Sequence, residues 1–144
     1  MRHIIDEVLE RSELIHDRAT IESSIDQMAV RIRKDCHGQF PVFLTLMHGG
    51  MFFASRLALE LGIDAEFDYL HATRYHGETT GSGLAWLHRP SVFIEGRTVL
   101  LVDDILESGR TLAFAKDLLS ARGARSVKSA VLLEKPDKRA VSIS

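Results

Sequence analysis

The chain of 144 residues contains a single cysteine, three prolines and one tryptophan. With Cys36 as its only thiol, it can form neither an intrachain disulfide framework nor a zinc site built from several cysteines. No apolar run reaches the roughly 18 residues that a membrane helix needs, and the N-terminal residues lack the apolar core of a signal peptide. These absences and the length predict one domain over residues 1–144 in a reducing compartment, the cytoplasm.

An excess of charge of either sign is also missing. Eighteen lysines and arginines stand against 20 aspartates and glutamates, so the formal net charge is −2. A domain that binds nucleic acids in general usually carries a basic excess, so this balance argues against nucleic acid as a partner. Hydrophobic residues make up 45% of the chain, which is instead typical of a globular protein with a packed core.

Apolar periodicity divides the chain into alternating helices and strands. Residues 17–36, 51–61 and 111–122 have the spacing of helices, with Asp17 or Thr20 placed to cap the first. The expected strands are residues 41–47, 66–71, 84–88, 97–102 and 126–133. This alternation predicts an α/β fold with a mostly parallel twisted sheet flanked by helices. Ligands of such sheets bind beyond the carboxyl ends of the strands.

Large apolar side chains between the motifs are interpreted first as packing residues. The expected helix 51–61 places four of them in the core: Phe52, Phe53, Leu57 and Leu61. Trp86 is interpreted as a residue of a sheet edge or an interface rather than as one that stacks on a base.

The most specific motif is the thirteen-residue string VLLVDDILESGRT at residues 99–111. A buried strand is expected to bring Asp103 and Asp104 to its carboxyl end, and a turn of small and polar residues then opens a helix. The amides of residues 108–111 and the positive end of the helix dipole suit a phosphate, and Gly109 lets the backbone approach it. The two carboxylates suit sugar hydroxyls or a magnesium ion. An ordinary capped helix start explains any three of these residues but not the whole string.

This string resembles the phosphoribosyl pyrophosphate (PRPP) signature of the purine phosphoribosyltransferases, and the resemblance extends over essentially the whole chain. LMHGG at residues 46–50 resembles the family's first pyrophosphate-binding loop. Residues 67–81 resemble the strand that leads to its flexible catalytic loop, and LEKP at residues 133–136 resembles its purine-recognition strand end. The order is similar to the bacterial hypoxanthine-guanine branch. It implies the type I phosphoribosyltransferase fold and a purine-salvage enzyme that makes IMP or GMP and pyrophosphate from PRPP and hypoxanthine or guanine.

The resemblance also implies roles for the matching residues. Asp103 and Asp104 would hold the ribose hydroxyls and support Mg²⁺, and Glu107 would take the proton from the purine ring. The residues implied at the 5′-phosphate are Ser108, Gly109, Arg110 and Thr111. Those implied at the pyrophosphate are Met47, His48, Gly49 and Arg139. Thr79 and Thr80 would belong to the flexible loop, and Lys135 would donate to the purine 6-oxo group. A homodimer or homotetramer is implied as well, with no membrane partner.

Three features depart from the family's pattern. Glu107 stands where an aspartate is usual, and His48 stands where lysine or arginine is common, which makes any charge there dependent on pH near neutrality. The segment that clamps the purine in the family is expected to be absent after Arg139. Two other interpretations stay open: a PRPP-sensing regulator that binds RNA or DNA on the same fold, and a purely structural fragment.

Overall fold

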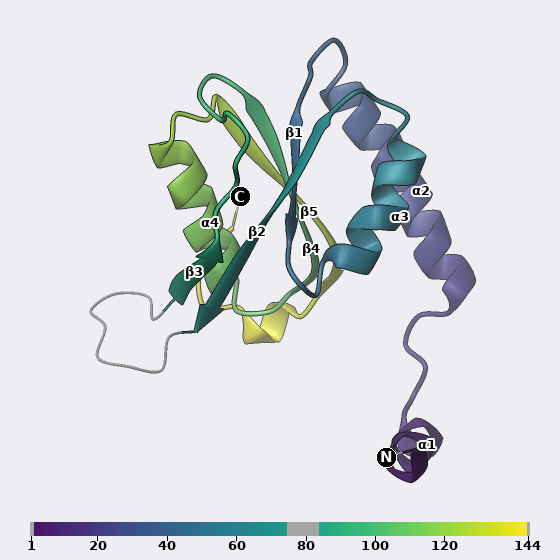
Figure 1. The fold of residues 1–144 in the computed structure, drawn as a ribbon. Coiled ribbons are helices and arrows are strands. Elements are labelled where there is room, and N and C mark those ends of the chain that lie inside the picture. Colours follow the sequence, from purple (N-terminus) through teal and green to yellow (C-terminus); the bar gives the residue numbers. More distant parts are fainter. Residues whose placement is uncertain (1, 75–83, 144) are drawn as a thin grey trace.

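The computed structural model describes residues 2–74 and 84–143 and is built around a five-stranded sheet with the strand order β3-β2-β1-β4-β5 (Figure 1). The strands are β1 (Val42–Leu46), β2 (Glu66–Arg74), β3 (Leu84–His88), β4 (Thr98–Leu106) and β5 (Ser126–Glu134). Strands β2, β1, β4 and β5 are parallel, and β3 pairs antiparallel with β2 at one edge. The predicted α/β fold with a mostly parallel sheet is confirmed.

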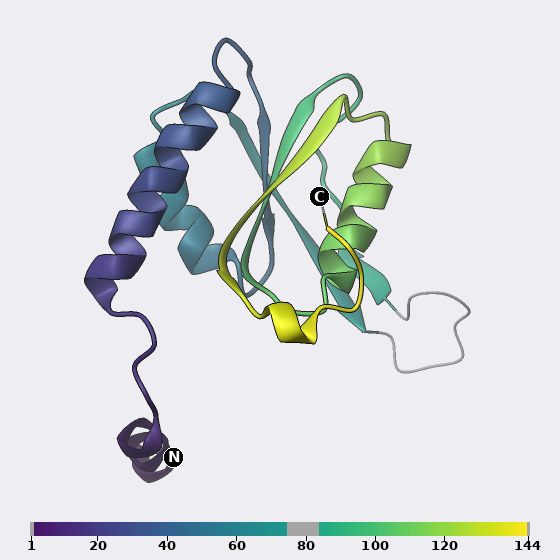
Figure 2. The same cartoon turned by 180° about the vertical axis from the view of Figure 1, so that it is seen from behind.

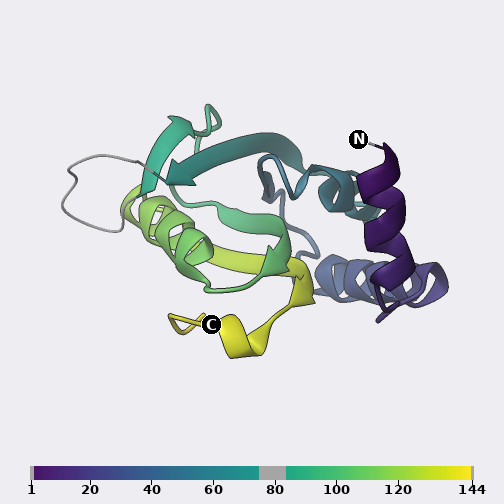
Figure 3. The ribbon, with the colours of Figure 1, turned by 90° about the horizontal axis from the view of Figure 1, so that it is seen from below.

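Helices cover both faces of this sheet. Helices α2 (Arg18–Asp35) and α3 (Met51–Leu61) lie on one face, and α4 (Arg110–Ala121) lies on the other (Figures 2 and 3). Helix α1 (Arg2–Arg11) stands apart from the sheet, and the short 3₁₀ helix η1 (Pro136–Lys138) follows β5. Within the described residues, no helix is long and apolar enough to cross a membrane.

Strand β4 shows why the sheet needs helices on both sides. Leu100 and Val102 pack into the core under α2 and α3, whereas Val99 and Leu101 pack into the core under α4. Successive side chains of a strand point to opposite faces, so a strand buried on both faces is continuously apolar. The run of apolar residues in β4 therefore places it in the middle of the sheet.

The N-terminal part of the chain contains one confirmed cap and one helix that the sequence analysis missed. The side chain of Asp17 accepts a hydrogen bond from the amide of Thr20 at 2.8 Å, so Asp17 is the cap of α2. Helix α1 was not expected. Its apolar residues, such as Ile4 and Leu9, are exposed, so no packing partner marks it.

Two other expectations are corrected. Strand β4 does not end at Val102 but continues to Leu106, because its pairing with β5 continues as far as the pair Leu106 and Glu134. The acidic pair therefore lies in the strand and not in the loop after it. Phe52 is 77% exposed on the outer side of α3, although its neighbour Phe53 is buried as expected, together with Leu57 and Leu61. Trp86 lies on the edge strand β3 and stacks on Phe114 of α4, with ring centroids 5.0 Å apart.

Candidate active site

The carboxyl ends of β1, β4 and β5 lie at one edge of the sheet, where η1 is seen at the bottom of Figure 1. The chain order of the strands reverses between β1 and β4, which are neighbours in the sheet. Such a switch point is where open α/β sheets bind ligands. The loop after β1 (residues 47–50) and the loop after β4 (residues 107–109) both start there.

The loop after β4 has the form of an anion site. Gly109 is the N-cap of α4 in the left-handed conformation, with a φ of 81°, and no side chain caps the helix. The amide of Arg110 donates to the Ser108 hydroxyl at 3.3 Å. The amides of Gly109 and Thr111 have no acceptor among the described residues. A helix N-terminus with unpaired amides binds anions, and the four predicted phosphate residues lie together in this one turn.

Two glycines bring the loop after β1 against the acidic pair. A Cβ at Gly49 would lie 3.1 Å from the carboxylate oxygens of Asp104. A Cβ at Gly50 would lie 2.7 Å from the Leu46 carbonyl oxygen and 3.1 Å from that of Val102. Side chains at these positions would push the loop away from β4. The predicted pyrophosphate loop and the predicted ribose carboxylates are thus in direct contact.

The acidic pair lies in a half-buried position at the end of β4. Asp103 accepts a hydrogen bond from the amide of Asp104 at 2.9 Å, and Asp104 accepts one from the amide of Ile105 at 2.8 Å. Burial, with a smaller contribution from Asp104, raises the pKa of Asp103 to about 7. No lysine, arginine or histidine forms an ion pair with either carboxylate within the described part of the chain.

These uncompensated carboxylates fit a magnesium ion that keeps substrate oxygens among its ligands. Mg²⁺ is commonly held by one or two carboxylates together with substrate phosphates rather than by a cage of protein ligands. The described residues contain no group of three or more histidine, cysteine or acidic side chains that could hold a metal ion.

Glu107 and Lys135 face each other from the ends of neighbouring strands. The Lys135 ammonium donates to Glu107 Oε1 at 2.8 Å, and the Lys135 amide donates to the Leu106 carbonyl at 2.8 Å. The ion pair lowers the pKa of the Glu107 carboxyl and raises that of Lys135. The residue predicted to take the purine proton and the residue predicted to contact the purine therefore lie together.

Arg139 is held at the loop after β4. Its Nε donates to the Glu107 carbonyl at 3.1 Å, and its terminal nitrogen donates to the Glu134 carboxylate at 2.7 Å. No hydrogen bond in the described chain joins Arg139 to the loop of residues 47–50. These contacts place it beside the phosphate loop, and its pyrophosphate role stays a prediction.

His48 packs against a residue that the sequence analysis did not assign to the site. Its ring centroid lies 4.3 Å from that of His71 in β2. The parallel register that pairs Leu46 with Leu70 brings these two histidines together, and no local motif signals it. Thr79 and Thr80 lie outside the described residues.

Comparison with known proteins identifies the family of this chain. A model of the phosphoribosyl transferase domain matches residues 12–143. The hypoxanthine-guanine phosphoribosyltransferase of Streptococcus agalactiae is 31% identical over 132 residues, which cover 91% of this chain and 73% of that protein. The enzyme of the same name from Lactococcus lactis is 33% identical over 140 residues, covering 96% and 75%.

Solved structures show the same relationship. The crystal structure of a hypoxanthine phosphoribosyltransferase from Staphylococcus aureus aligns with a TM-score of 0.85 at 28% identity, covering 92% of this chain and 73% of that chain. A hypoxanthine-guanine phosphoribosyltransferase from Bacillus anthracis aligns with a TM-score of 0.83 at 26% identity, covering 92% and 77%. The domain match, the curated relatives and the shared fold together show that this chain belongs to the phosphoribosyltransferase family.

Proposed function

We propose that the protein is a purine-salvage enzyme that transfers the phosphoribosyl group of PRPP to hypoxanthine or guanine, giving IMP or GMP and pyrophosphate. The observation that carries this proposal is the pair of Glu107 and Lys135, which lies beside an uncapped helix N-terminus and an acidic pair. The relatives of this chain carry the corresponding enzyme name.

The ribose 5-phosphate half of PRPP would bind at the loop after β4. The amides of Ser108, Gly109 and Thr111 meet the 5′-phosphate, aided by the positive end of α4. Asp103 and Asp104 accept hydrogen bonds from the ribose hydroxyls. Positive charge develops on the sugar as the glycosidic bond breaks, and preorganised carboxylates stabilise that charge.

The pyrophosphate would leave along the loop after β1. The backbone of Gly49 lies against Asp104, and the amides of His48 and Gly49 would be donors for the departing oxygens, whereas the Met47 amide already donates to the Leu70 carbonyl at 2.9 Å. When bound, magnesium neutralises charge on the pyrophosphate.

The purine would bind between the ends of β4 and β5. Glu107 accepts the proton that the attacking purine nitrogen loses. General-base catalysis of this kind raises a reaction rate by about 10²–10⁴-fold. When the purine binds, the Lys135 ammonium leaves the Glu107 carboxylate and donates to the purine 6-oxo group. The 6-oxo oxygen is a suitable partner because it accepts hydrogen bonds and an ammonium can only donate them. Adenine presents an amino group at this position, so Lys135 would select 6-oxopurines.

The test is nucleotide formation, followed by chromatography, from PRPP, Mg²⁺ and each of hypoxanthine, guanine, xanthine and adenine. We expect IMP from hypoxanthine and GMP from guanine. The variant Glu107→Gln is the control and should form both nucleotides more slowly. A parallel gel-shift assay with RNA and DNA at stated salt tests the regulatory alternative, which no structural observation favours. Absence of product with every purine would contradict the proposal.

We also propose that the enzyme is a cytoplasmic homodimer or homotetramer. Support comes from apolar surface on and beside α3, where Phe52 is 77%, Phe67 55% and Met51 39% exposed. Light scattering of the purified protein measures the assembly, and a monomer at micromolar concentration would contradict it.

A further inference from the structure

Residues 139–143, here named the strap, fold back along the phosphate loop after η1 (Figure 2). The amides of Ala140 and Val141 both donate to the Ser108 carbonyl, at 2.8 and 3.2 Å. The Arg139 guanidinium donates to the carbonyl of Glu107 at 3.1 Å. Both loop carbonyls that precede Gly109 are therefore held by the strap.

Side chains of the strap close over Gly109. A Cβ at Gly109 would lie 3.0 Å from Ile143 Cγ1, 3.2 Å from Arg139 Cδ and 3.3 Å from Val141 Cγ2. Gly109 is buried by this contact, and its positive φ already favours glycine. The strap thus packs directly on the backbone of the phosphate loop.

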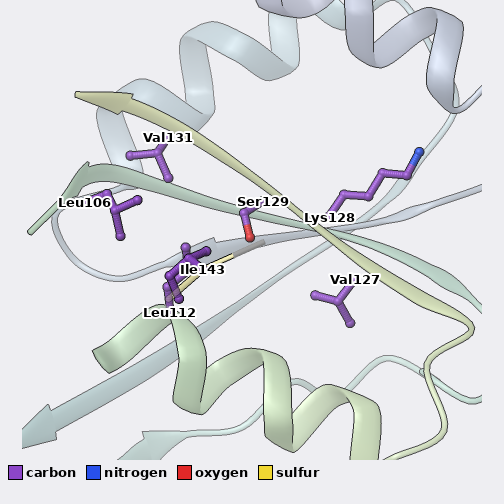
Figure 4. Close-up of a pocket in the computed structure, with 7 residues that line it drawn as sticks. All are labelled: Leu106, Leu112, Val127, Lys128, Ser129, Val131 and Ile143. Carbon is purple, nitrogen blue, oxygen red and sulfur yellow. The ribbon is translucent and has the colours of Figure 1, made fainter. Parts of the chain in front are cut away.

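The space behind the loop is incompletely filled (Figure 4). A cavity of about 400 Å³ lies between β5 and α4, and Leu106 and Leu112, which flank the loop, both line it. Ile143 lines the same cavity and contacts Gly109. Ile143 of the strap therefore packs on the loop and forms part of the wall of this space at the same time.

Peptide geometry links the strap to the anion site. In a trans peptide the carbonyl and the N–H point in opposite directions. The strap amides hold the Ser108 carbonyl, so the amide of Gly109 in the same peptide unit points away from the strap. Arg139 holds the Glu107 carbonyl, so the amide of Ser108 also points away from the strap.

From these contacts, we propose that Val141 and Ile143 are positioning residues for the 5′-phosphate: together with the strap amides, they hold the amides of Ser108 and Gly109 in the direction that binds it. This inference rests on the proposed function, because it takes the 5′-phosphate of PRPP and of the nucleotide product as the anion.

The test compares the double variant Val141→Ala/Ile143→Ala with wild type and with Ser142→Ala, an exposed neighbour in the strap. Calorimetry with Mg²⁺ measures binding of IMP, which carries the phosphate, and of pyrophosphate, which does not use this loop. We expect the double variant to bind IMP at least about tenfold more weakly. This factor corresponds to one charge-assisted hydrogen bond between the phosphate and a loop amide that is no longer held in place. The KM for PRPP should rise similarly, with pyrophosphate binding unchanged.

Two further variants separate positioning from folding. Val141→Ile/Ile143→Val keeps the apolar volume and should restore IMP binding. Ala140→Pro removes one amide donor to the Ser108 carbonyl without deleting an apolar side chain. If the double variant does not fold, this variant is measured in its place. Unchanged IMP affinity in the folded variants, or equal weakening of IMP and pyrophosphate, would overturn the inference. Wild-type protein that binds IMP but makes no nucleotide would contradict the proposed function alone, because the binding comparison still tests the strap.

Discussion

Asparagine in place of Asp103 should make the protein more stable at alkaline pH. Burial raises the pKa of Asp103 from 3.8 to about 7, so the folded protein binds more protons than the unfolded chain between these values. Stability therefore falls as the pH rises through this window. Three pKa units at about 1.4 kcal/mol each set an upper limit of about 4 kcal/mol on the cost of the ionised carboxylate. Asparagine keeps the shape and avoids that charge.

Urea unfolding of wild type and Asp103→Asn at pH 4 and pH 8 measures the effect. The two proteins should be nearly equal at pH 4, whereas at pH 8 the variant should be more stable by as much as about 4 kcal/mol. Asp137→Asn, at an exposed position in η1, is the matched control and should show no such difference between the two pH values. A variant that is equally or less stable than wild type at pH 8 would refute the reasoning. The same substitution should weaken PRPP binding, because the Asp103 carboxylate would accept a hydrogen bond from a ribose hydroxyl of PRPP.

Three further changes test the site and its surroundings. Glu107→Gln should lower kcat while leaving the calorimetric Kd of PRPP unchanged, because the carboxylate acts only as the proton moves; unchanged turnover would remove it as the base. Lys135→Ala should shift the acid limb of the pH profile of kcat/KM, which reports the free enzyme, to higher pH, because the ammonium lowers the pKa of Glu107. The same variant should discriminate less against adenine in competition assays. Ser129→Ala should raise the free energy of unfolding in urea by about 1 kcal/mol. The reason is that the Ser129 hydroxyl is buried without a hydrogen-bond partner among the described residues and points into the cavity in Figure 4. Ser142→Ala is the control and should leave the free energy of unfolding unchanged.

The sequence was most informative where structure depends on neighbours along the chain. The apolar run of β4, the turn at Gly109 and the start of α4 follow one another without interruption, so strand, phosphate loop and helix could be placed within a few residues. The cap at Asp17 is equally local.

Prediction was weaker where an element ends because of pairing with another element. The extension of β4 to Leu106 depends on the length of β5, and nothing within β4 itself reveals it. Phe52 and Phe53 are equally apolar, and only the rotation of α3 against the sheet decides that Phe53 is buried.

By itself the sequence determined the order of the elements from α2 to β5, the membership of the family and the residue types of the candidate site, because periodicity and contiguous motifs are properties of a linear chain. Only the tertiary structure decided which distant groups meet. Gly49 contacts Asp104, Lys135 pairs with Glu107, and the strap holds the carbonyl of Ser108. The physical reason is that strand order and register set these contacts, and both result from packing the whole sheet between its helices.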